Sequence, residues 1–88
     1  MTKSAAELSD ARRAIRDKVI ALARRRNVDA SNLKDNELIP ESGALDSVAI
    51  LELITWFEMT FNLMIPQADL TVENFGTIDA MAGYLDRA

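Results

Sequence analysis

The sequence contains neither cysteine nor histidine. Without cysteine there can be no disulfide, no thiolate nucleophile and no cysteine metal site. Without histidine the chain lacks the usual general base, the usual zinc ligand and the partner that activates a serine nucleophile. Enzymes built on Ser-His or Cys-His pairs are therefore excluded. A chain of 88 residues also has little room to enclose a substrate around paired carboxylates, so we expect no catalysis by this chain alone.

Long apolar runs are absent as well. No run approaches the roughly 20 residues of a membrane-spanning helix, and the N-terminus, MTKSAAELSD, lacks the apolar core of a secretory signal. We therefore expect no membrane span and a cytoplasmic location. Hydrophobic residues make up 49% and charged residues 27%, a mixture typical of a folded protein. At this length we expect one domain, residues 1–88, and a monomer.

Charge is divided unevenly along the chain. The net charge is −4, with +5 in residues 1–34 and −9 in residues 35–88. The larger acidic part would steer the protein toward basic partner surfaces. Arg24, Arg25 and Arg26 are interpreted as a charge cap at the negative end of a helix dipole. Without interleaved aromatics they fall short of a nucleic-acid stripe, and no nucleic-acid partner is expected.

A first helix is predicted over residues 5–26. Ser4 and Glu7 have the spacing of a capping box at its start. Apolar residues then recur at intervals of three and four, which aligns them on one face. This face comprises Leu8, Ala11, Ile15, Val19 and Leu22.

Residues 27–46 lose this periodicity and are rich in Asn, Asp and Ser, which predicts a long loop. Its apolar residues are expected to pin it to the helices: Val28, Leu33, Leu38, Ile39 and Leu45. A second helix is predicted over residues 47–62, a short third over 71–75, and a fourth over 77–86 capped by Thr77. The expected core faces are Ile50, Leu53, Ile54, Phe57 and Phe61 in the second helix, and Ile78, Met81, Ala82 and Leu85 in the fourth. The predicted fold is an all-α four-helix bundle with three longer helices and one short one.

The segment Gly43-Ala44-Leu45-Asp46-Ser47 leads directly into the second predicted helix. It puts a serine hydroxyl at a helix N-terminus, where unpaired amides and the helix dipole favour a phosphate. Ordinary capping by Asp46 or Ser47 explains the same residues, and the local pattern does not decide between the two interpretations.

From this segment onward the sequence resembles the acyl and peptidyl carrier protein family. The resemblance includes Gly-x-Leu-Asp-Ser at residues 43–47, the apolar and acidic pattern through Pro66, the segment 70–75 and the last predicted helix. It implies an acyl-carrier-like bundle in which Ser47 carries a covalent 4′-phosphopantetheine arm derived from coenzyme A. Asp46 matches the preceding aspartate, which supports the attachment. The arm would supply the thiol that this chain lacks.

The resemblance implies a non-catalytic phosphoprotein that carries acyl groups as thioesters in fatty-acid or related lipid or secondary-metabolite biosynthesis. Its partners would be a phosphopantetheinyl transferase and acyl-loading, elongating or acyltransferase enzymes. The alternatives are an aminoacyl, D-alanyl or peptidyl carrier, and a helical interaction module that is never modified.

The second predicted helix departs from the fatty-acid carriers, whose exposed face is usually rich in acids. Ala49, Met59, Thr60 and Met64 occupy positions where acids are common. We predict a more apolar surface for partner binding, beginning beside Ser47, and dedicated partner enzymes. Its residues are Val48, Leu51, Glu52, Thr55 and Met59. Trp56 lies at the border of this surface and is expected to pack on a neighbouring loop.

Overall fold

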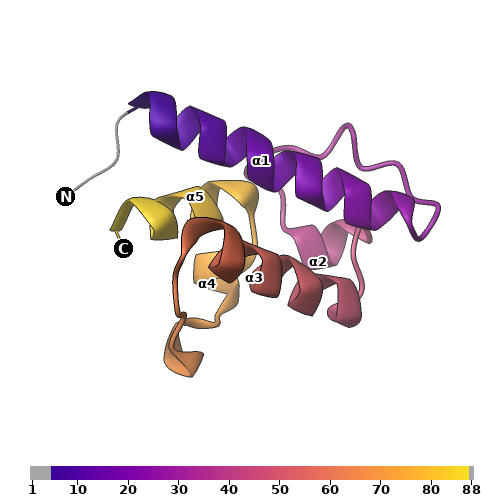
Figure 1. Ribbon diagram of the computed structural model, residues 1–88. Coiled ribbons are helices and arrows are strands. Elements are labelled where there is room, and N and C mark those ends of the chain that lie inside the picture. Colours follow the sequence, from indigo (N-terminus) through magenta and orange to yellow (C-terminus); the bar gives the residue numbers. More distant parts are fainter. Residues whose placement is uncertain (1–4, 88) are drawn as a thin grey trace.

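The computed structural model describes residues 5–87, which form helices joined by loops (Figure 1). The elements are α1 Ala5–Arg24, α2 Ile39–Ser42, α3 Ser47–Phe61, the 3-10 turn η1 Gln67–Asp69, α4 Val72–Phe75 and α5 Ile78–Arg87. The long α1 packs against α3 and α5, and the short α4 packs against α5 (Figure 1). This is the predicted all-α bundle of three longer helices with short ones between them.

Helix α1 places its predicted apolar face in the core. Ile15, Val19 and Leu22 are almost fully buried, while Leu8, near the start, is only half-buried. The helix ends at Arg24, before the predicted residue 26, because Asn27 adopts a left-handed conformation with φ of 61°. The predicted capping serine, Ser4, lies outside the described residues.

The segment predicted as an irregular loop contains the one-turn helix α2, and this part of the prediction was wrong. Pro40 lies in the first turn of α2, and Gly43 ends the helix in the left-handed conformation with φ of 78°. Proline at the start and glycine at the end are the usual signals of a helix, and here they lie too close together to suggest one. The apolar residues of this segment attach it to the core, as predicted, since Leu33, Ile39 and Leu45 are buried.

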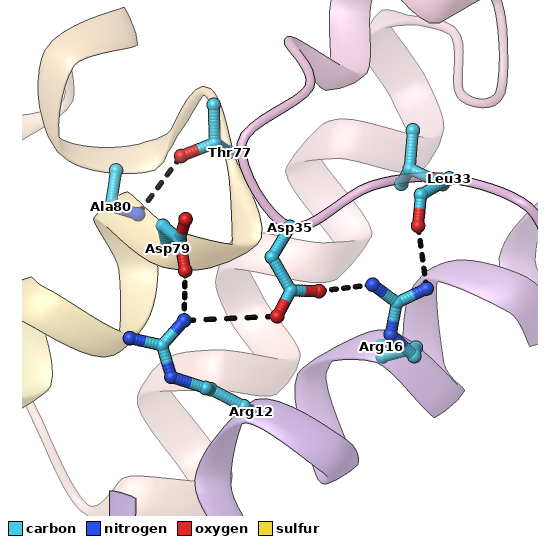
Figure 2. Close-up of polar contacts among 7 residues, drawn as sticks. All are labelled: Arg12, Arg16, Leu33, Asp35, Thr77, Asp79 and Ala80. Carbon is cyan, nitrogen blue, oxygen red and sulfur yellow. Dashed lines mark hydrogen bonds and ion pairs between the residues drawn. The ribbon is translucent and has the colours of Figure 1, made fainter. Parts of the chain in front are cut away.

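A network of charged residues also fastens this segment to the helices (Figure 2). The Arg16 guanidinium donates to the carboxylate of Asp35 and, at 2.6 Å, to the carbonyl of Leu33. Arg12 pairs with Asp79 at the start of α5, and its guanidinium lies 3.8 Å from the Asp35 carboxylate. The segment before α2 is thereby held between α1 and α5.

Helices α3 and α5 each bury one face in the core. In α5 the predicted core face is confirmed, since Ile78, Met81, Ala82 and Leu85 are all buried, and the Thr77 hydroxyl accepts the Ala80 amide at 2.9 Å. In α3 the buried line is Ala49, Leu53 and Phe57, spaced four residues apart. Ile50, Ile54 and Phe61 were predicted in the core but are only half-buried, because they flank this line.

Candidate functional site

Ser47 is the first residue of α3, and its side chain is exposed to solvent. Asp46 is the N-cap, with an extended backbone, and its Oδ1 accepts the Ala49 amide at 2.8 Å. The Ser47 hydroxyl makes no hydrogen bond to any residue between 5 and 87. The structure therefore assigns the capping to Asp46 and leaves the serine hydroxyl accessible at the positive end of the helix dipole.

The turn before Ser47 is anchored on both sides. Ala44 and Leu45 are 4% and 3% exposed, so both side chains are packed in the core. From the end of α1, Arg26 donates from Nη1 to the carbonyls of Gly43 at 3.2 Å and Ala44 at 3.1 Å. Its Nε lies 3.5 Å from Oδ2 of Asp46. The serine is thus presented by a turn that is held to the core and to α1.

The role of Arg26 was missed by the sequence interpretation, which assigned the arginines to the helix dipole. Its contacts reach residues 17 and 18 positions along the chain, so no local pattern reports them. Arg25 likewise reaches across to α3, where its Nη1 lies 3.0 Å from Oε2 of Glu52 and its Nη2 donates to Oε1 at 3.1 Å. The opposite charges of the basic and acidic segments were the one available hint of these contacts.

The residues predicted to bind partners gather in a single groove of about 610 Å³ on α3. Val48 and Leu51 are 64% and 63% exposed, and Met59 is 78% exposed. The residues lining the groove are Lys18 from α1, with Val48, Leu51, Glu52, Thr55, Trp56, Met59 and Thr60 from α3. We call this feature the α3 groove. It begins at the residue next to Ser47.

One prediction about this surface was wrong. Ala49 is 7% exposed and belongs to the core, because its position aligns with the buried residues Leu53 and Phe57 on one face of α3. Trp56 is half-buried; it lines the groove and packs edge-on against Phe61 at 5.8 Å between ring centroids. Met64 is 92% exposed but lies beyond the end of α3 and does not line the groove.

The aromatic side chains between α3, α4 and α5 form a continuous chain of ring contacts. Phe57 contacts Phe61 and Phe75 at centroid distances of 5.0 and 5.7 Å, and Phe75 contacts Tyr84 at 4.9 Å. The Tyr84 hydroxyl donates to Oδ2 of Asp69 at 2.8 Å. This hydrogen bond, assisted by burial and by the charge of Asp69, raises the pKa of Tyr84 above its ordinary value.

Two further observations bear on chemistry. Within residues 5–87, His, Cys, Asp and Glu side chains form no cluster of three or more that could hold a metal ion. No helix in the described part of the chain has the length and apolar character required to cross a membrane.

The fold and the site are a small helical bundle with an exposed serine, Ser47, at the N-terminus of α3, where Asp46 and not the serine caps the helix. The family model for the phosphopantetheine attachment site matches residues 14–85. The chain belongs to this family, which confirms the resemblance noted in the sequence. Comparisons with curated proteins and with solved structures gave no match.

As a member of this family the protein is a non-catalytic carrier that bears a 4′-phosphopantetheine prosthetic group. Carrier domains of this kind are modified by phosphopantetheinyl transferases and interact with enzymes that load them.

Proposed function

We propose that Ser47 is the phosphopantetheine attachment site and that residues 1–88 act as one acyl carrier domain. The observation that carries the proposal is the exposed Ser47 hydroxyl at the first position of α3, with Asp46 capping the helix in its place. A transferase needs a hydroxyl that is accessible and unpaired, and both conditions hold at this residue.

The residues around Ser47 fit a phosphodiester. The first amides of a helix have no partner within the helix, and the helix dipole favours a negative charge at this end. Arg26 offsets the charge of the neighbouring Asp46, which reduces the repulsion between that carboxylate and a phosphate on Ser47. The prosthetic group supplies the thiol that a chain without cysteine cannot provide.

The apolar α3 groove beside the attachment residue supports acyl cargo and partners of apolar character. In this proposal the protein carries acyl thioesters in fatty-acid or related lipid or secondary-metabolite biosynthesis and is served by dedicated enzymes. An aminoacyl or peptidyl carrier is the other outcome of the test below.

The attachment is tested by incubating the unmodified protein with coenzyme A and a broad-specificity phosphopantetheinyl transferase and measuring the intact mass. One arm is expected on the wild type and on the control Ser9→Ala, whose serine is exposed on α1. No arm is expected on Ser47→Ala, which should unfold at the same denaturant concentration as the wild type. An unmodified wild type, under conditions that modify a known carrier, would contradict the proposal.

The cargo is tested by the intact mass of the protein purified from its native cell. A mass that corresponds to a fatty or related acyl group on the arm would support the proposal. An amino acid on the arm would replace it with the aminoacyl alternative.

A further inference from the structure

Every carboxylate on α3 and at its N-cap is already engaged within the chain. Both oxygens of Glu52 face the Arg25 guanidinium, at 3.0 and 3.1 Å. Glu58 accepts the Ile65 amide on Oε2 at 3.0 Å. Asp46 holds the Ala49 amide and lies beside Arg26. Helix α3 contains no other acidic residue. Glu52, the acidic residue that lines the α3 groove, is therefore already paired with a cation of this chain.

The free charge beside the α3 groove is positive. Lys18 lines the groove from α1, and its ammonium makes no hydrogen bond or ion pair to any residue of the described range. Arg25 lies seven residues further along the chain, just beyond the end of α1. Its side chain is 63% exposed, against 41% for Glu52, so the outer part of this ion pair is the cation. The centre of the groove remains apolar, with Val48, Leu51 and Met59 exposed.

We infer that the α3 groove docks an enzyme surface that is apolar at its centre and carries carboxylates at its rim, with Lys18 and Arg25 determining this choice. The inference rests on the proposed carrier function, because a carrier must dock on the enzymes that load and use it. It reverses the polarity expected from the net charge of residues 35–88, since Glu52 is paired with Arg25 and Lys18 lines the groove.

Charge complementarity is the physical reason for this choice. Apolar contacts provide the area that is buried in the complex. Opposite charges at the rim raise the association rate and disfavour binding to partners of like charge. A basic enzyme surface would meet Lys18 and Arg25 as like charges, and it could reach Glu52 only by displacing Arg25. A partner carboxylate could form an ion pair with Lys18 without displacing any group. A second partner carboxylate could contact Arg25 while Arg25 stays paired with Glu52.

The groove fits a protein better than a nucleic acid. Phosphate recognition depends on several unpaired cations along one track. Arg25 and Arg26 are paired with carboxylates here, and the floor of the groove is aliphatic with the single tryptophan, Trp56, at its side. Methionine, leucine and valine offer contact area to apolar protein side chains instead.

The test uses the full-length protein carrying an acyl-phosphopantetheine arm, verified by intact mass before any docking assay. The probes are a fatty-acid elongation enzyme whose carrier-docking patch is basic and a variant of that enzyme in which these lysines and arginines are replaced by glutamate. Each enzyme is normalised by its turnover of acyl-pantetheine free of any carrier. The measured quantity is the ratio of kcat/KM for the acidic and basic enzymes.

The wild type is expected to favour the acidic enzyme by about tenfold or more, because like charges at an interface are costly. The Lys18→Glu/Arg25→Glu variant should reverse the preference, and Lys18→Glu alone should reduce it without disturbing the ion pair to Glu52. The matched control, Arg13→Glu/Lys34→Glu, makes the same change in net charge at exposed residues outside the groove and should behave as the wild type.

The wild-type preference should also shrink at high salt, where exposed charges are screened. A wild-type preference for the basic enzyme, an equal shift in the control variant, or a preference independent of salt would overturn the inference. Failure of the proposed function is a separate result, because it would be seen earlier as the absence of the arm on Ser47 in the mass spectrum.

Discussion

Arg26 lies 3.5 Å from Asp46 and joins the end of α1 to the N-cap of α3. The same guanidinium donates to the carbonyls of Gly43 and Ala44, so one side chain contacts both ends of the turn that precedes Ser47. A residue at the end of one helix thus determines how the first residue of another is presented.

Replacing Arg26 with alanine should therefore destabilise the turn and slow the addition of the arm. The lost hydrogen bonds and the partly exposed ion pair predict a decrease of about 1 to 2 kcal/mol in the free energy of unfolding. Arg26→Lys should restore only part of the transfer rate, since an ammonium cannot reach the carbonyls and the carboxylate as a planar fork does. The measurements are chemical denaturation and transferase kinetics. Arg24→Ala, at an exposed neighbouring residue, should leave both unchanged.

Phe57 is expected to be among the most sensitive core positions. It is fully buried and makes ring contacts with Phe61 and Phe75. Phe57→Ala should lower the free energy of unfolding by about 3 to 5 kcal/mol, as other large-to-small core changes do. Met64→Ala, at a residue 92% exposed, serves as the control and should change it by less than about 0.5 kcal/mol. A loss below about 1 kcal/mol for Phe57→Ala would contradict the packing of α3 described above.

Two glycines should respond oppositely to alanine. A Cβ at Gly76 would lie 2.5 Å from the Val72 carbonyl oxygen and 3.2 Å from Cδ2 of Leu38, so Gly76→Ala should cost about 1 to 3 kcal/mol. A Cβ at Gly83, inside α5, would meet only the flexible end of Arg87, at 3.5 Å. Gly83→Ala should therefore stabilise the protein by about 0.5 to 1 kcal/mol. Thermal unfolding of the two variants, compared side by side, tests both signs.

Tyr84 should ionise at higher pH than an ordinary tyrosine. The hydrogen bond to Asp69 is the main cause, so Asp69→Ala should lower the pKa of Tyr84 toward its usual value. The protein has a single tyrosine, and the ultraviolet absorbance of tyrosinate during a pH titration reports this residue alone. A midpoint unchanged by Asp69→Ala would contradict the assignment.

The raised pKa of Tyr84 also predicts how stability depends on pH. The folded state holds the phenolic proton more tightly than the unfolded state does. The resulting stabilisation is fully present below the ordinary pKa of about 10 and is lost as the pH rises through the folded-state value. The free energy of unfolding should therefore fall less steeply with alkaline pH in Asp69→Ala than in the wild type, which chemical denaturation at a series of pH values would measure.

The apolar faces of the helices and the places where helices begin could be predicted from the sequence, because they depend on residues only a few positions apart in the chain. The spacing of Ile15, Val19 and Leu22 places them on one face of a helix, whatever that helix packs against. The cap of α5 follows from Thr77, whose short side chain reaches an amide only three residues away, and the sequence limits the cap of α3 to Asp46 or Ser47. Ser47 at the start of α3 is a consequence of the same local chemistry.

The tertiary structure decided which side chains meet across the bundle. Arg25 reaches Glu52 over 27 residues of chain, and Lys18 joins the α3 groove, only because α1 packs beside α3. Ala49 is buried in the core, although the comparison with fatty-acid carriers, in which acids are common at this position, suggested an exposed residue. Local periodicity tells which residues share a face, but the direction in which each face points, and the charges that meet there, depend on how distant segments pack.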